Sequence, residues 1–301
     1  MKVYFSDYYC LELPVGHRFP MGKYSQLRDY LLEQKIIDVS ELHESPLATE
    51  DELSLAHDPQ YVASMKDGSI DPLIIRKIGF PWSHNLFLRS CATVGGALAA
   101  AKHALKDGIA GNLAGGTHHA HYASGAGYCV FNDIAVATRH LHTKSPNLKI
   151  AIIDLDVHQG DGNSSILAND KNVFIFGIHG EKNYPFVKVP SHLDIALPDG
   201  VEDQDYLTAL KVGMESIYKF KPDFIFYQTG VDPLSFDALG KMSLSFEGLM
   251  ERDKIVLEYA LNSKIPISLA LGGGYAKPIE KSVEAYANTY RVVKSLLGKT
   301  T

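Results

Sequence analysis

The stretch KIAIIDLDVHQGDGNSS, residues 149–165, changes character in its middle. Residues 150–153 form an unbroken apolar run, which is typical of a strand buried on both faces of a parallel sheet. Three carboxylates and an imidazole follow within eight positions, namely Asp154, Asp156, His158 and Asp161. A core strand that ends in so many ionisable side chains predicts a functional site at its carboxyl end.

The composition limits the classes of protein to which the chain can belong. It has 301 residues, of which 46% are hydrophobic, and a net charge of −6. We interpret residues 1–301 as one large α/β domain without a nucleic-acid partner, because the sequence shows no extended basic patch. The three scattered cysteines form no Cys-x-x-Cys pair and predict neither disulfides nor a thiolate metal site. Without a signal-peptide pattern or an apolar run of about 18 residues, we expect a cytoplasmic protein with no membrane span. The oligomeric state cannot be predicted.

Apolar runs alternate with amphipathic segments along the chain. This alternation predicts a parallel sheet covered by helices on both faces. We expect strands at residues 2–6, 109–113, 149–155, 172–178, 223–229 and 265–271. We expect helices at residues 22–36, 83–106, 132–143, 203–220, 246–262 and 277–297.

Polar stretches follow four of the predicted strands. They are GGTHHAHYASGAGYC (115–129), DLDVHQGDG (154–162), GVDPLSFD (230–237) and LGGGY (271–275). In open α/β sheets, ligands bind beyond the carboxyl ends of the strands. We therefore expect these four stretches to converge on one site.

Asp156 and His158 have the spacing of a metal-ligand pair. In an extended chain, residues i and i+2 point the same way, and Asp154 shares that direction. Asp232, which follows another strand, is the best candidate for a third ligand. Carboxylate oxygen with imidazole suits Zn²⁺, and Fe²⁺ is an alternative. The alternative to metal binding is that the Asp-x-Asp-x-His stretch caps a helix or binds nothing.

The adjacent His118 and His119 lie in a glycine-bracketed loop and predict acid–base chemistry. A histidine held by a carboxylate can take a proton from water and return one to a leaving amine. Asp154 and Asp161 are available to hold these histidines. For His121 a surface position is favoured.

Tyr275 follows three glycines at the end of an apolar strand. Glycines let the backbone approach a ligand closely, and a phenol there can donate a hydrogen bond to a developing oxyanion. Taken alone, this stretch favours a structural turn with an incidental tyrosine.

Together, these motifs resemble those of the histone deacetylase family of zinc amidohydrolases. GGTHHA, GAGYC, DLDVHQGDG, GVDPLSFDALGKMSLS and LGGGY occur in the family's order. Three features are most similar to the class IV branch and its bacterial relatives. They are the HQGDG sequence, the early HRFPMGKYSQL segment and the short chain. The resemblance implies the arginase/deacetylase-like fold, one α/β domain around a mainly parallel eight-stranded sheet.

The resemblance also implies roles for individual residues. Zinc ligands would be Asp156, His158 and Asp232. His119 would be the principal acid–base residue, His118 would tune charge, Asp154 and Asp161 would be their partners, and Tyr275 would polarise the acyl carbonyl.

Further roles concern the substrate and a second ion. Gly127 and Tyr128 would line the acyl-lysine channel, and Tyr184 would face them. Lys23 would occupy the basic position of an internal product channel. A structural K⁺ is also implied, held by backbone carbonyls of Asp154, Asp156 and His158 and of neighbours near Gly177, with the Asp154 side chain contributing.

The implied activity is hydrolysis of acetyl or longer acyl groups on lysine-like amines, in a peptide or protein or in a small amine such as a polyamine. One alternative is a two-metal ureohydrolase, whose extra carboxylates are replaced here by Gly160 and Leu234. Another is a non-catalytic scaffold that binds acyl-lysine. The loop at residues 77–90 lacks the acid with which many family members hold the substrate backbone. Phe80 and Trp82 in this loop either cover an apolar substrate or only shield the protein from solvent.

Overall fold

Eight parallel strands form the central sheet, in the order β2-β1-β3-β8-β7-β4-β5-β6. The computed structural model describes residues 1–298, so the last three residues of the expected domain lie outside the described residues. The strands are β1 (Lys2–Phe5), β2 (Leu42–Glu44), β3 (Ile109–Asn112), β4 (Ile150–Asp154), β5 (Val173–Gly180), β6 (Leu193–Leu197), β7 (Phe224–Gln228) and β8 (Ile267–Ala270). The predicted α/β fold and all six predicted strands are confirmed. The edge strands β2 and β6 were not predicted.

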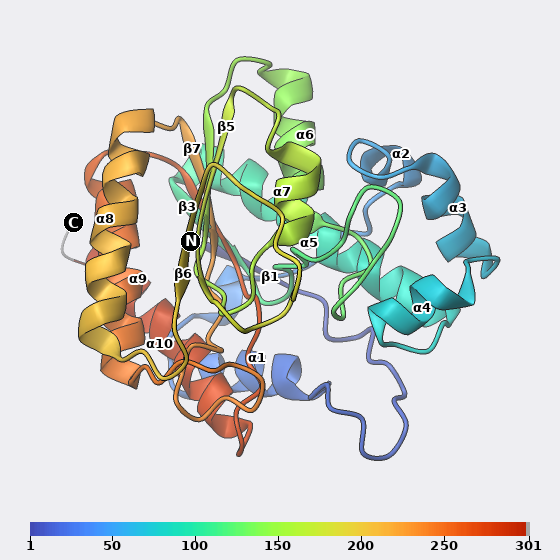
Figure 1. Cartoon of the computed structure of the whole chain (residues 1–301), viewed down its shortest axis with the longest axis horizontal. Helices are drawn as coiled ribbons and strands as arrows, with labels where there is room; N and C mark the ends of the chain where they lie inside the picture. The colour runs from blue at the N-terminus through green and yellow to red at the C-terminus, as the bar shows by residue number, and fades with distance from the viewer. Residues whose placement is uncertain (299–301) are drawn as a thin grey trace.

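Helices cover both faces of this sheet, as Figure 1 shows. Helices α1, α8, α9 and α10 pack on one face, and α5, α6 and α7 lie on the other. Strand β4 contributes to both cores, because Ile153 packs in one apolar cluster and Ile152 packs in the opposite one. This two-sided burial explains the unbroken apolar run of β4. The helices are α1 (Lys23–Glu33), α2 (Glu50–Leu53), α3 (Pro59–Asp67), α4 (Pro72–Ile78), α5 (His84–Asp107), α6 (Asp133–Lys144), α7 (Asp161–Leu167), α8 (Asp203–Phe220), α9 (Phe246–Asn262) and α10 (Glu280–Leu297), with a 3₁₀ turn at Val39–Glu41.

The short helices α2, α3 and α4 extend the domain beyond α5 (Figure 1). They were not predicted, although each has a strong start signal. Thr49 and Glu52 form a capping box at α2. The side chains of Asp58 and Asp71 cap α3 and α4, and each is followed by a proline at the first helical position. No helix within residues 1–298 combines the length and apolarity needed to cross a membrane.

Buried His57 ties these helices to the loop that precedes α6. Its Nε2 accepts a hydrogen bond from the Asn132 backbone at 2.8 Å, and its Nδ1 lies 3.0 Å from the carbonyl oxygen of His121. Burial disfavours the charged ring and lowers the pKa of His57 to about 4, against the opposing effect of the carbonyls of Tyr122 and His121.

His57 is expected to make the protein less stable in mild acid. The unfolded chain binds this proton below about pH 6.5 and the folded protein only below about pH 4, so stability falls as the pH drops between these values. The loss from this one group amounts to roughly 3 kcal/mol. Urea unfolding of wild type and His57→Gln between pH 7 and 4.5 should show a shallower pH dependence in the variant. The exposed His84→Gln is the matched control, and equal slopes for wild type and His57→Gln would contradict the assignment.

Candidate active site

Four neighbouring strands bring the predicted site residues together at their carboxyl ends. The tandem histidines follow β3, the Asp-x-Asp-x-His stretch ends β4, Asp232 follows β7, and Tyr275 follows β8. These strands are adjacent in the order β3-β8-β7-β4, although the segments that follow them are far apart in the sequence. The expected convergence at one edge of the sheet is therefore found.

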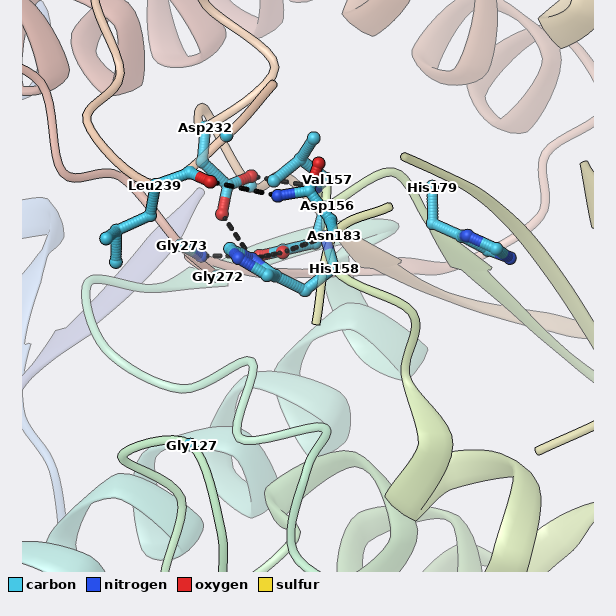
Figure 2. A network of polar contacts seen from close by, with 12 residues as sticks. Gly127, Asp156, Val157, His158, His179, Asn183, Asp232, Leu239, Gly272 and Gly273 are labelled. Carbon is cyan, nitrogen blue, oxygen red and sulfur yellow. Dashed lines mark hydrogen bonds and ion pairs between the residues drawn. The ribbon is translucent and has the colours of Figure 1, made fainter. Parts of the chain in front are cut away.

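Asp156, His158 and Asp232 form one compact cluster of metal-binding groups. Their ligand atoms all lie within 4.8 Å of one another. His158 Nδ1 is 3.1 Å from Asp156 Oδ1 and 3.0 Å from Asp232 Oδ2. Figure 2 shows Asp232 directed toward His158, whereas His179 lies away from the cluster. Within residues 1–298 no second group of three such side chains has this spacing.

Backbone amides fix the two carboxylates of this cluster. The N–H of Val157 donates to Asp232 Oδ1 at 2.8 Å, and the N–H of Gly273 donates to Asp156 Oδ2 at 2.6 Å (Figure 2). Any side chain at position 273 would clash, because a Cβ there would lie 2.0 Å from Asp232 Oδ2. The glycines before Tyr275 thus allow the backbone to approach the carboxylates closely.

The cluster is electrostatically suited to a cation. Burial and the neighbouring Asp156 raise the pKa of Asp232 to about 7. Although burial opposes it, hydrogen bonds to Asp156 and Asp232 raise the pKa of His158 to about 10. Two buried carboxylates thus compete for one imidazole proton. A divalent ion would satisfy both carboxylates and the imidazole at once, and this set of two oxygens and one nitrogen fits Zn²⁺ or Fe²⁺.

The two adjacent histidines are each held by a different carboxylate, as predicted. His118 Nδ1 lies 2.8 Å from Asp154 Oδ2, and His119 Nδ1 lies 2.6 Å from Asp161 Oδ1. Their rings are 4.1 Å apart between centroids, and all four side chains are buried. Each carboxylate fixes one ring nitrogen and leaves Nε2 for other contacts.

The electrostatic environment shifts the pKa values of the two histidines in opposite directions. Burial opposes charge on His118, but the carboxylates of Asp154 and Asp156 outweigh it and raise its pKa to about 9. Burial and the nearby His118 lower the pKa of His119 to about 4, against the pull of Asp161. Near neutral pH, His119 is therefore the uncharged member and can accept a proton, whereas His118 carries charge.

Tyr275 lies beside the cluster with its backbone held from the β7 loop. Its N–H donates to Asp237 Oδ2 at 2.6 Å, and the other oxygen of Asp237 accepts from Leu239 and Gly240. Burial, together with the charges of Asp156 and Asp232, keeps the pKa of Tyr275 well above its ordinary value. The phenol therefore keeps its proton and can act as a hydrogen-bond donor.

One cavity of ≈ 490 Å³ leads to these groups. Gly127, Tyr128 and Tyr184 line it, and the Tyr184 ring meets the His119 ring edge to face at 4.9 Å. A Cβ at position 127 would lie 2.7 Å from His119 Cδ2, and the backbone there has φ +53°, so glycine fits this wall. Lys23 is buried in the same cavity, 3.1 Å from the carbonyl oxygen of Gly274.

Of the two alternatives for Phe80 and Trp82, which lie between α4 and α5, cover of a substrate is not supported by their positions. Phe80 is buried behind Tyr128, with ring centroids 5.2 Å apart, and Trp82 donates its indole N–H to the carbonyl of Met65. Neither residue lines the cavity. Phe80 therefore packs behind the cavity wall, against Phe19 and Tyr128, whereas the Trp82 side chain is 38% exposed and contacts α3 at Met65.

Comparison with protein families identifies this arrangement. Residues 17–290 match the family model described as the histone deacetylase domain. The chain belongs to the histone deacetylase family. Among its family relatives, an uncharacterised protein of Picosynechococcus sp. is 40% identical over 98% of both chains. Histone deacetylase 2 of Arabidopsis thaliana is 28% identical, with 87% of this chain and 70% of the plant protein aligned.

The fold of this histone deacetylase family member also agrees with a solved structure. A histone deacetylase homologue complexed with SAHA superposes with a TM-score of 0.82 at 28% identity, covering 97% of this chain and 82% of the other. The family places the protein among deacetylase-type amidohydrolases and confirms the resemblance that the motifs indicated. The two-metal ureohydrolase alternative has no support, since Gly160 and Leu234 add no ligand to the cluster.

Two residues around the deacetylase-family site differ from expectation. His121 is only partly exposed, and its Nε2 lies 3.1 Å from Asp161 Oδ2, so Asp161 contacts two histidines. Asp237 was missed, although it anchors the backbone of Tyr275. Its position within GVDPLSFD was the available signal, because a carboxylate in a polar loop after a strand often accepts backbone hydrogen bonds.

Proposed function

We propose that the protein is a metal-dependent deacylase that hydrolyses acetyl or longer acyl amides of lysine-like amines. The observation that carries the proposal is the cluster of Asp156, His158 and Asp232 at the cavity, beside two carboxylate-held histidines. These three side chains would hold Zn²⁺, with Fe²⁺ as the alternative. When bound, the ion would polarise the acyl carbonyl and lower the pKa of a water molecule.

The protein's own residues account for the remaining chemistry. Neutral His119 accepts a proton as water attacks the carbonyl, and Asp161 keeps its other ring nitrogen in place. Tyr275 donates a hydrogen bond to the oxyanion that develops. Charged His118, paired with Asp154, adds positive potential beside it. A protonated histidine then gives its proton to the leaving amine.

The cavity walls support a linear amine substrate. Tyr128 and Tyr184 would flank the alkyl stem, with Gly127 giving the stem room beside His119. Lys23 would lie in the product channel, where its ammonium group sits 4.8 Å from the centre of the Tyr275 ring. The proposal also includes a structural K⁺ near Asp154, His158 and Gly177, which line a second, small cavity. We also propose that the protein is related to the class IV branch of the family and is located in the cytoplasm.

The proposed function is tested by turnover after reconstitution with Zn²⁺ or Fe²⁺. Acetyl-lysine peptides and acetylated polyamines are assayed side by side, and a chelated sample is the control. Release of acetate that depends on added metal supports the proposal. A fully metal-loaded protein that hydrolyses neither class would favour the acyl-lysine-binding scaffold.

Longer acyl chains are expected to be hydrolysed at least as well as acetyl. Each further buried methylene contributes about 0.8 kcal/mol if the pocket that receives it is dry. On one peptide sequence, kcat/KM should therefore stay equal or rise from acetyl to butyryl and octanoyl. A steep fall along this series would leave an enzyme restricted to acetyl groups.

A further inference from the structure

The outer part of the cavity is strongly basic. Among the described residues that line it, five are exposed, and four of these are cations. We call the four cations the basic mouth: Arg18, Lys77, Lys182 and Lys241. The fifth exposed residue is the apolar Phe186.

The basic mouth is built from four separate chain segments that are fixed against the channel wall. On one side, the carbonyl oxygen of Lys77 accepts the N–H of Gly127 at 3.0 Å. His17, next to Arg18, places Nε2 2.9 Å from the Gly79 carbonyl and packs its ring on Phe80.

The other side of the mouth is held by the loops that follow β5 and β7. Lys241 Nζ donates to the carbonyl oxygen of Lys182 at 3.2 Å. The side chain of Asn183 donates to the carbonyl oxygen of Leu239 at 2.9 Å. These bonds join the two loops, so the opening and the wall form one connected structure.

Little negative charge compensates these cations. Asp156 is the one acid among the described residues that line the cavity, and it is buried within the metal-binding cluster. Within residues 1–298, the carboxylate nearest to any of the four is Asp199, 3.8 Å from Lys182 Nζ, and both of these side chains are exposed. No carboxylate among the described residues lies within ion-pairing distance of the other three.

We infer that the basic mouth selects acylated amines that carry negative charge on the amine side of the amide. The inference rests on the proposed function, in which the acyl carbonyl lies at the metal-binding cluster and the rest of the amine extends past Tyr128 and Tyr184 to the opening. A cleft lined by charges of one sign raises the local concentration of oppositely charged ligands and repels like charge. The mouth therefore favours an acidic peptide or a carboxylate-bearing amine, and it disfavours polyamines.

A pair of small substrates isolates the charge. N-acetyl-aminocaproate and N-acetylcadaverine have the same five-methylene stem and end in a carboxylate and an ammonium group, respectively. The anion should have a kcat/KM at least about tenfold higher, mainly through KM, and the ratio should shrink as salt is raised. Acetyl-lysine peptides flanked by glutamate or by lysine form the second pair. A preference seen only with the two small amines indicates that the natural substrate is a small amine. A preference seen only with the two peptides indicates a protein segment.

Charge reversal at the mouth tests whether these residues cause the preference. The double variant Lys77→Glu with Lys241→Glu should abolish or invert the ratio. The matched control, Lys102→Glu with Lys171→Glu, changes two exposed lysines that do not line the cavity and should keep it. Thermal unfolding confirms that both variants are folded.

The outcomes separate the two proposals. Suppose that an uncharged acetyl-lysine peptide is hydrolysed but neither substrate pair shows a charge preference, or that the preference survives in the Lys77→Glu, Lys241→Glu variant. In either case the basic mouth does not select substrates, and the deacylase proposal stands. If no acyl amide is hydrolysed, the deacylase proposal fails. Binding of the two labelled peptides, measured by fluorescence anisotropy, then decides the question of charge, and equal affinities overturn the inference.

Discussion

Replacing His158 by alanine is expected to abolish metal binding and amide hydrolysis together. His158 supplies the one nitrogen of the cluster, and its Nδ1 lies between Asp156 and Asp232 at 3.1 and 3.0 Å. Without it, two buried carboxylates remain as ligands and repel each other. Asp156→Ala should have the same effect, because it also leaves two of three ligands.

The measurement is metal content after dialysis, followed by turnover at saturating acyl-lysine peptide. His140→Ala in α6 is the control, since its side chain does not line the cavity. That control should keep both metal and activity. Stoichiometric metal with normal turnover in either His158→Ala or Asp156→Ala would show that the ligands have been assigned wrongly.

Tyr275→Phe should retain metal and fold but lose about 10²–10³ in kcat, the usual effect of removing one oxyanion donor. The phenol keeps its proton, because its pKa is raised by burial and by the charges of Asp156 and Asp232. Phenylalanine preserves the ring against which Lys23 packs and removes only the hydroxyl. The loss should therefore appear in kcat rather than in KM.

Tyr61→Phe gives a matched comparison. Its hydroxyl donates to the carbonyl of Val130 at 2.8 Å, away from the cavity lining, so its removal should lower thermal stability and leave kcat unchanged. An unaltered kcat in Tyr275→Phe would remove this residue from the mechanism. A loss of metal in that variant would indicate a structural role instead.

The central strands and the site could be predicted because their signals are local. Strands β4 and β7 are buried on both faces and read as unbroken apolar runs, each followed directly by polar residues. The edge strands were harder to recognise. β2 has three residues and β6 is only partly buried, so neither shows a strong pattern. Their pairing is decided by neighbours that are distant in sequence.

The missed contacts have the same origin. His57 and Asp237 are defined by partners up to 75 residues away, and a single residue type carries no sign of them. Helix α7, DGNSSIL, contains residues with poor helix propensity and was not predicted. Its first turn is held from outside, since the N–H of Gly162 donates to the carbonyl of His118 at 2.8 Å. Tertiary contacts there outweigh local preference.

The position of β8 bears on how the domain assembles during synthesis. It is the last strand within residues 1–298, yet it lies in the middle of the sheet, between β3 and β7. Until residues 267–270 emerge from the ribosome, the β2-β1-β3 and β7-β4-β5-β6 groups cannot join, and each presents an unpaired inner edge. Such edges favour association between nascent chains, and non-local pairing slows closure. A chain that stops before β8 would therefore leave the sheet divided into two unconnected groups rather than shortened at one edge.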